Sequence, residues 1–250
     1  MEGYKSRWYL FFLAALISGV NLFGNNKSIV AASSFGTHIY RPVLQPTEVL
    51  PLIGTYTMKN TEGEVCIKAS LGAQYIVIIQ KKRWFFNLDP LKVLASGSCH
   101  RDLAVLSLTI PNNGASLQFT FKKENNHYYV TRLLASLIPQ PVCLGCANKT
   151  YSGLVSRSKL FAASYGRSFT CKSANVVLTS SEMSINMVPV HMQAFGVPNG
   201  QYGEVEECLA DFIKRTVPVI VLAIGVGLLM IAVVTLLLLK EHRMHGYERF

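Results

Sequence analysis

The sequence predicts an all-β, two-sheet domain outside the cytosol, followed by one C-terminal transmembrane helix. Three observations support this fold class: a long uncharged run near the C-terminus, six cysteines that all precede it, and period-two alternation of apolar residues in between. Apolar residues make up 50% of the 250 residues, charged residues make up 15%, and the mean hydropathy is +0.29. Such a composition argues against a free cytosolic enzyme.

The transmembrane helix is predicted over residues 217–239, which carry no charge. A helix of this length extends about 34 Å, enough to cross a hydrocarbon core of roughly 30 Å. Backbone polar groups within lipid must be satisfied inside the segment, so we expect a helix despite Pro218. Ala223 and Gly227 have the small-xxx-small spacing that lets two helices pack closely in a lipid bilayer, so a homo-oligomer through the span stays open.

The N-terminus has the features of a signal peptide. Lys5 and Arg7 precede the apolar run of residues 8–20, which is too short to span a bilayer comfortably and is followed by small and polar residues. We expect a signal peptide within residues 1–32, with the cleavage point left open. An uncleaved N-terminal anchor is the alternative.

One signal and one late span give a type I topology. A short N-terminal segment (33–51) and a luminal domain (52–215) would lie outside the cytosol, and residues 240–250 would form a cytoplasmic tail. The luminal part carries 18 Lys+Arg and 11 Asp+Glu, a balance of 18 − 11 = +7. This compartment excludes nucleic acid as a partner. The basic runs Lys81–Arg83 and Lys122–Lys123 read as solvated strand ends, and an anionic-ligand patch is the alternative.

Strand patterns fill the luminal domain. Apolar residues alternate with others over 104–110 and again over 117–121, on either side of Asn113-Gly114, which predicts a β-hairpin. Similar patterns predict strands at 74–80, 127–134 and 185–195. Helical periodicity before the span is limited to a short piece near 209–214. We therefore expect one antiparallel domain of two sheets, large enough for its own core.

All six cysteines lie in the luminal part, where an even count predicts disulfides. Six cysteines allow 15 connectivities, although local spacing suggests Cys66 with Cys99 and Cys171 with Cys208. Cys143 and Cys146 are left over. Prolines precede this pair and a polar loop follows it, whereas a redox site of the thioredoxin type needs a strand before it and a helix after it. A zinc site would need a second pair, and the other four cysteines are better used as disulfides. A small local disulfide or an intermolecular bond is favoured.

Several short motifs, in order along the chain, resemble a known family. They are Gly54–Thr57, Val65–Ala69, Leu71–Gln74, Phe86–Pro90 and Ala95–Cys99 in the first half, then Phe169–Ser173, Gln193–Phe195, Tyr202-Gly203 and Glu207-Cys208. Together with the single span and the tail ending Gly246–Phe250, they resemble the membrane-proximal part of the lysosome-associated membrane glycoprotein (LAMP) family. The chain looks like a single-domain form, most similar to the dendritic-cell branch.

The resemblance implies a β-prism, a variant of the sandwich, for the luminal fold. It also implies the pairings Cys66–Cys99 and Cys171–Cys208. The chain departs from the family pattern at Cys143 and Cys146, in lacking a second domain and a mucin-like hinge, and in having only two glycosylation sequons, Asn26 and Asn148. Cleavage after residue 32 would remove the first sequon.

The C-terminal residues Tyr247 and Phe250, with Gly246 before them, form a Tyr-x-x-apolar sorting signal. Medium subunits of clathrin adaptors bind such a segment in extended form, with pockets for the ring and the apolar side chain. The motif is common by chance, but its position at the end of an eleven-residue tail is typical of an address. We therefore expect a lysosomal and late endosomal membrane protein that can transit the plasma membrane.

Catalysis is not expected. Motifs for a nucleophilic serine, a P-loop, a zinc hydrolase or a dinucleotide cofactor are absent from the sequence, and the luminal histidines are scattered. Glu204, Glu206 and Glu207 read as a solvated approach to the membrane. The expected role is structure or protein contact in lysosome or autophagosome traffic, without cofactor or metal. The alternative is a macrosialin-like surface or phagosomal receptor for an anionic or lipoprotein ligand.

Overall fold

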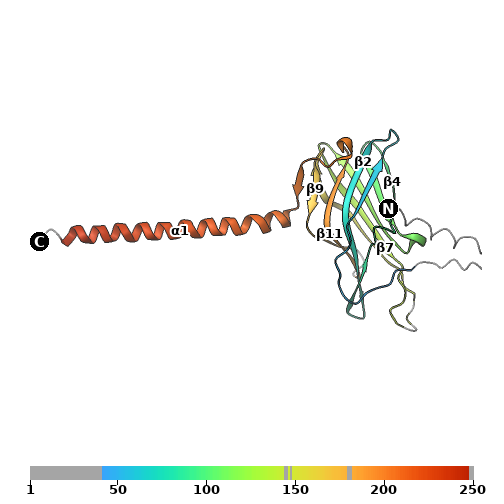
Figure 1. The fold of residues 1–250 in the computed structure, drawn as a ribbon, viewed down its shortest axis with the longest axis horizontal. Coiled ribbons are helices and arrows are strands. Elements are labelled where there is room, and N and C mark those ends of the chain that lie inside the picture. Colours follow the sequence, from blue (N-terminus) through green and yellow to red (C-terminus); the bar gives the residue numbers. More distant parts are fainter. Residues whose placement is uncertain (1–40, 144–145, 147, 179–181, 248–250) are drawn as a thin grey trace, which may run out of the picture. The chain divides into compact units, whose positions relative to one another are not determined.

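A computed structural model describes residues 41–143, 146, 148–178 and 182–247. Within these residues, twelve strands form two sheets and one long helix follows them (Figure 1). The all-β, two-sheet domain with a C-terminal helix confirms the predicted fold class. The signal-peptide segment, Asn26 and Phe250 lie outside the described residues.

The first sheet is a simple antiparallel meander. Its strands lie side by side in chain order, which places β4 and β8 at the edges. In the part of the chain that the structure describes, it has five strands: β4 (Leu94–Cys99), β5 (Leu103–Thr109), β6 (Ala115–Glu124), β7 (His127–Leu137) and β8 (Tyr151–Ser164). The predicted hairpin is the β5–β6 pair.

The second sheet is built around β2 and β11, which pair along most of their length. The order is β1-β2-β11-β9-β12, with β3 also paired to β2 and β10 to β11. Its seven strands among the described residues are β1 (Gly54–Lys59), β2 (Val65–Ile79), β3 (Lys82–Asn87), β9 (Ser168–Cys171), β10 (Ala174–Val177), β11 (Met183–Ala194) and β12 (Val205–Glu207). The short β12 runs parallel to β9, whereas the other pairs are antiparallel.

The core lies between the two sheets and follows from the alternation in the sequence. Every second residue of β5 and β6 points inward, so Leu106, Leu108 and Phe119 are fully buried while Ser107 and Gln118 are not. Apolar residues of the second sheet, from β2, β9 and β11, complete one shared cluster. Two buried faces of this kind make the β domain a sandwich.

The turn of the β5–β6 hairpin contains the expected Asn113-Gly114, but the glycine does not supply its left-handed residue. Residues Pro111–Asn113 form a short 3-10 turn (η1), and the left-handed conformation falls on Asn112 (φ 58°) and Asn113 (φ 52°). Gly114 instead adopts an ordinary right-handed conformation. Asparagine tolerates the left-handed region because its short polar side chain can hydrogen-bond locally, so the glycine is not needed there.

Candidate functional sites

The disulfide Cys66–Cys99 connects the two sheets at one edge. Cys66 lies at the start of β2 and Cys99 at the end of β4, with 6.4 Å between their Cα atoms. This Cα separation is within the range that disulfides span. The edge strands β1 and β4 of the two sheets lie next to this bond.

The disulfide Cys171–Cys208 fixes the last strand and the start of the helix. Cys171 ends β9, and Cys208 lies between β12 and helix α1 (Leu209–Tyr247). The amide of Cys208 donates to the carbonyl of Thr170, and the amide of Lys172 donates to Oδ2 of Asp211 at 2.6 Å. The helix therefore begins on residues that are held to β9 by covalent and hydrogen bonds.

Asp211 also lies beside these two sulfurs. Its carboxylate and both sulfur atoms fall within 4.8 Å of one another, a group that could in principle hold a metal ion. The sulfurs are bonded to each other, however, and it is the free thiolate that binds metal. The carboxylate instead accepts the Lys172 amide and lies in the first helical turn, where negative charge is favourable.

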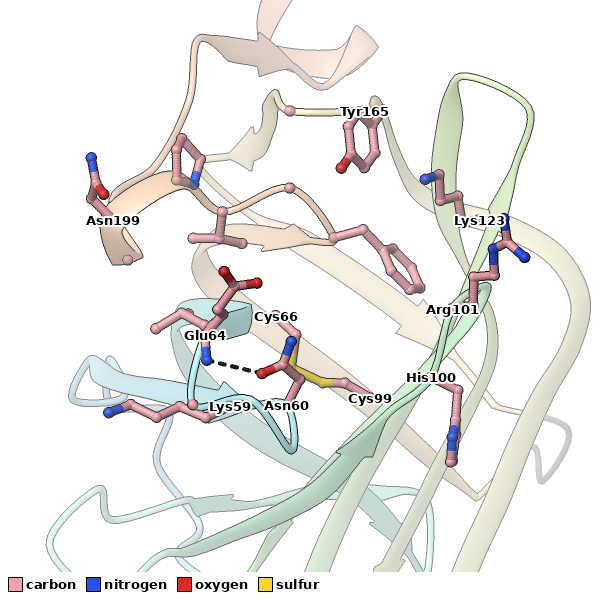
Figure 2. A pocket seen from close by; sticks show the side chains of 18 of the residues that line it. Lys59, Asn60, Glu64, Cys66, Cys99, His100, Arg101, Lys123, Tyr165 and Asn199 are labelled. Atoms are coloured by element: carbon pink, nitrogen blue, oxygen red, sulfur yellow. Dashed lines mark hydrogen bonds between the residues drawn. A yellow bond between two sulfur atoms is a disulfide. The ribbon is translucent and has the colours of Figure 1, made fainter.

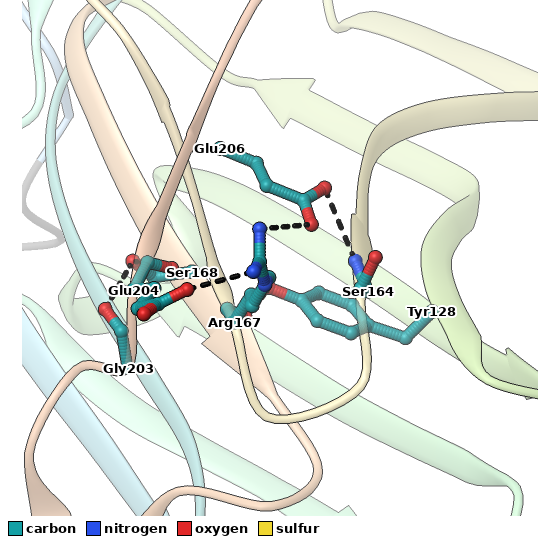
Figure 3. A network of polar contacts seen from close by, with 7 residues as sticks. All are labelled: Tyr128, Ser164, Arg167, Ser168, Gly203, Glu204 and Glu206. Carbon is teal, nitrogen blue, oxygen red and sulfur yellow. Dashed lines mark hydrogen bonds and ion pairs between the residues drawn. The ribbon is translucent and has the colours of Figure 1, made fainter.

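Arg167 lies between two carboxylates, one from the last strand, β12, and one from the residue just before it, as Figure 3 shows. Its guanidinium contacts Glu204 (Nη2 to Oε2, 2.7 Å) and Glu206 (Nη1 to Oε1, 3.7 Å). The other oxygen of Glu206 accepts the amide of Ser164 at 3.2 Å, and the Tyr128 hydroxyl donates to the carbonyl of Arg167 at 3.0 Å. We call these residues, Tyr128, Ser164, Arg167, Glu204 and Glu206, the Arg167 cluster.

The acidic run is largely exposed, as expected of a solvated segment, but its carboxylates also form ion pairs that the sequence did not reveal. Glu204 and Glu206 pair with Arg167, while Glu207 pairs with Arg215 of α1 at 2.7 Å. Glu204 directly precedes β12 and Glu206 lies within it, so Arg167 contacts both the strand and the residue before it. The acidic residues thus support the three-residue strand β12.

His191 has specific partners in the fold. The sequence, in which the histidines are scattered, did not indicate them. The Nε2 atom of this histidine lies 3.0 Å from the hydroxyl of Ser168, and its ring stacks on Tyr202 with centroids 3.7 Å apart. Burial lowers the pKa of His191 below its usual value, and the nearby ammonium of Lys68 lowers this pKa further. The neutral ring is therefore favoured at this position.

A cavity of about 950 Å³ opens at one end of the β domain (Figure 2). Segments far apart in sequence line it: the β1–β2 turn, the β4–β5 turn, the end of β6, the β8–β9 turn and the loop after β11. Both cysteines of the Cys66–Cys99 disulfide also line it. Its charged lining side chains are Lys59, Glu64, Arg101 and Lys123, with His100 beside them.

The remaining cysteines and the sequon share the segment between β7 and β8. Cys143 and Cys146 form a local disulfide, and the amide of Cys146 donates to the carbonyl of Cys143. Asn148 is exposed, and its side-chain oxygen accepts a hydrogen bond from Arg41 at 2.8 Å. Residues 144, 145 and 147 lie outside the described part, and glycosylation of Asn148 stays a prediction.

Helix α1 is longer than the apolar run that predicts it. It begins at Leu209 and ends at Tyr247, and its segment 209–241 is the one described helix long and apolar enough to cross a membrane. The side chains of residues 217–239 are exposed rather than packed in the β core. The helix continues through Gly246, so the described part of the tail is helical where an extended peptide was expected.

The β domain is similar in sequence to a known family of luminal domains. Residues 41–209 match the family described as lysosome-associated membrane glycoprotein 2-like, luminal domains. The chain belongs to the LAMP family. It is therefore a member of a family of lysosomal membrane glycoproteins, and its single apolar helix fits a single-pass membrane protein.

Similar LAMP proteins include lysosome-associated membrane glycoprotein 3 of Mus musculus, 29% identical over 96% of this chain and 59% of that protein. Lysosome-associated membrane glycoprotein 2 of Cricetulus griseus is 30% identical over 86% of this chain and 50% of its own length. The chain thus spans between half and three fifths of these relatives.

Solved structures agree with the fold. The crystal structure of human LAMP-3, also called DC-LAMP, is 28% identical with a TM-score of 0.56, covering 63% of this chain and 99% of that one. The membrane-proximal domain of mouse LAMP-1 is 24% identical, with a TM-score of 0.53, over 64% of this chain and 99% of that one. The resemblance to the dendritic-cell branch of the LAMP family is thereby confirmed.

Proposed function

We propose that this LAMP chain is a type I glycoprotein of late endosomal and lysosomal membranes that is sorted by its cytoplasmic tail. Tyr247 and Phe250 would bind the medium subunit of a clathrin adaptor, with passage through the plasma membrane on one route. The observation that carries the proposal is the placement of a Tyr-x-x-apolar signal after the single apolar helix of a LAMP chain. No catalytic role is proposed.

Recognition by an adaptor requires the end of α1 to unwind. The adaptor binds an extended peptide, whereas the described chain is helical through Tyr247. The last turn of a helix leaves carbonyl groups without partners, and Gly246 lowers the helix propensity of that turn. Unwinding the residues around Gly246 should therefore cost little free energy.

The luminal domain would act as a structural or protein-contact module in lysosome or autophagosome traffic. Its sheets are joined by Cys66–Cys99, and its last strand is held by Cys171–Cys208 and the Arg167 cluster. Cross-links of this kind stabilise a fold in an oxidising lumen. They support a stable scaffold that presents its surface outside the cytosol.

The test is the steady-state location of the full chain with Tyr247→Ala. We expect the variant to move from acidic organelles to the plasma membrane, because the adaptor loses the ring that fills its tyrosine pocket. Arg249→Ala is the matched control, since it changes a tail position between the two anchors and should leave the location unchanged. If both variants stay in lysosomes, the tail is not the address.

A second function, a receptor for an anionic ligand, is favoured by one observation. Lys59, Arg101 and Lys123 line the large cavity and make no ion pair with any carboxylate of the described residues. Other cations of the domain, such as Lys149 and Arg167, do have carboxylate partners. The unpaired cations support a ligand-binding role beside the structural one.

A further inference from the structure

We propose that the 950 Å³ cavity at the Cys66–Cys99 end of the β domain binds a sulfated oligosaccharide. The inference rests on the receptor function proposed above and not on sorting by the tail. Three features carry it: the cavity's size, the cations without ion pairs on opposite sides of it, and the neutral amide side chains that also line it.

The size suits a ligand of several rings. Sites for small molecules and cofactors enclose roughly 300–1,000 Å³, and this cavity lies near the upper end of that range. Part of its lining is apolar, from the disulfide with Val65, Phe195 and Val197. A ligand with a less polar ring face and charged substituents matches this combination of apolar and cationic lining.

The charges are arranged around the rim. Figure 2 shows Lys59 on one side of the cavity and Arg101 and Lys123 on the other. Glu64 is the sole acidic residue among the described lining residues, so the formal balance is three cations against one anion. Lys123 lies 4.0 Å from the ring centroid of Tyr165, a contact that leaves its positive charge unneutralised.

A ligand whose anions are separated along its length matches this spacing. Sulfate groups on a sugar chain meet this condition, and the fork of Arg101 suits an oxyanion. Asn60 lies between Lys59 and the two cations opposite (Figure 2), and Asn199 also lines the cavity; both offer amide groups for hydroxyls. The side-chain oxygen of Asn60 already accepts the amides of Glu62 and Glu64, which leaves its NH2 group to donate.

Hydrogen bonds fix the loop after β11, which lines the cavity. The fully buried Gln193 donates to the carbonyl of Gly196 at 2.8 Å and accepts the amide of Gly203 at 2.8 Å. Lys68 donates to the carbonyl of Gly200 at 2.7 Å. A side chain at Gly196 (φ +57°) would lie 2.9 Å from the ring of Tyr165, so glycine permits the close packing there. A fixed wall lowers the free-energy cost of ordering a binding site.

The experiment measures binding of a heparin-derived octasaccharide to the purified full-length protein by calorimetry at acidic pH. Lys59→Gln with Arg101→Gln should weaken binding about tenfold, because each removes one oxyanion contact. Lys81→Gln with Lys82→Gln is the charge-matched control outside the cavity and should change affinity less than about twofold. Glu64→Gln removes the lining anion and should tighten binding.

Both pairs of substitutions lie at exposed positions, and equal melting temperatures would show that the variants fold. A desulfated octasaccharide and inositol hexakisphosphate complete the experiment as separate probes. The proposal is overturned if the wild type fails to bind, if the control pair weakens binding as much as the cavity pair, or if the desulfated chain binds equally well. Binding of the phosphate probe with no binding of the octasaccharide overturns the saccharide assignment. None of these outcomes bears on where Tyr247→Ala resides in the cell.

Discussion

The ring of His191 couples the stability of the β domain to pH. The ring contacts Ser168 of β9 and Tyr202 of the loop after β11. The positive charge of Lys68 on β2 also acts on it electrostatically. Burial, followed by the charge of Lys68, lowers the pKa of His191 in the folded state. The unfolded chain, with a histidine pKa of about 6.5, therefore binds more protons than the folded chain in the window below that value.

The sign of the effect follows from this difference. The stabilising contribution is present above about pH 6.5 and is lost as the pH falls toward the lower pKa of the folded state. We predict that the melting temperature of the wild type falls more steeply between about pH 7 and pH 5 than that of His191→Gln. Glutamine retains a polar group for Ser168. Parallel curves for the two proteins would contradict the prediction.

The sequence could not reveal these partners because they lie on different strands. Ser168, His191 and Tyr202 meet only when β9 pairs with β11 and the following loop returns across them. The same holds for the cavity, whose cations come from the end of β1, the β4–β5 turn and β6. The sequence shows which residue types are present. The pairing and register of the strands determine which side chains come into contact.

The strand β12 depends on contacts beyond its own three residues. Its backbone pairs with β9, and the Arg167 cluster adds two ion pairs to that pairing. We predict that Arg167→Gln lowers the free energy of unfolding by no more than about 1 kcal/mol, because the arginine is half exposed. Amide exchange in Val205–Glu207 should nevertheless accelerate.

Lys159→Gln is the matched control for that variant. Lys159 pairs with Glu124 of β6 at 3.5 Å rather than with a carboxylate next to β12, and its side chain is 69% exposed against 48% for Arg167. Hydrogen exchange measured by mass spectrometry should show faster exchange in β12 for Arg167→Gln and not for Lys159→Gln. Equal exchange in the two variants would mean that the Arg167 cluster does not hold β12.

The disulfides should differ in their contribution to stability. Cys66–Cys99 closes a sequence separation of 33 residues, whereas Cys143–Cys146 closes a separation of 3. In the chain-entropy model the first contributes roughly 3–4 kcal/mol and the second about 2 kcal/mol. Replacing both cysteines of each pair by serine, with unfolding followed in denaturant, tests this order. A larger loss for Cys143→Ser with Cys146→Ser would reverse it.

Strands with clear alternation were predictable, and short or polar edge strands were not. The residues of β5, β6, β7 and β11 carry period-two apolar patterns because one face of each lies in the core. Strand β4 has the sequence LASGSC, is almost entirely exposed and lies at a sheet edge. Without a buried face, such a strand leaves no periodic signal.

As a membrane protein, the chain combines a cross-linked β domain with one apolar helix and a short tail. The apolar run was long enough to predict the helix, but the structure extends it from Leu209 to Tyr247. Lys240 and Glu241, which follow the apolar run, favour helix, so the helix does not stop where the apolar residues do. The proposed Tyr-x-x-apolar signal therefore begins at Tyr247, the last residue of the described helix.

We propose that residues 240–250 carry the address of the molecule. Transfer of this tail to a single-span reporter that otherwise resides at the plasma membrane, with the reporter's location then scored, tests the proposal without the luminal domain. We expect the tail to move the reporter to lysosomes and Tyr247→Ala within it to return the reporter to the cell surface. A reporter that stays at the surface with the unchanged tail would contradict it.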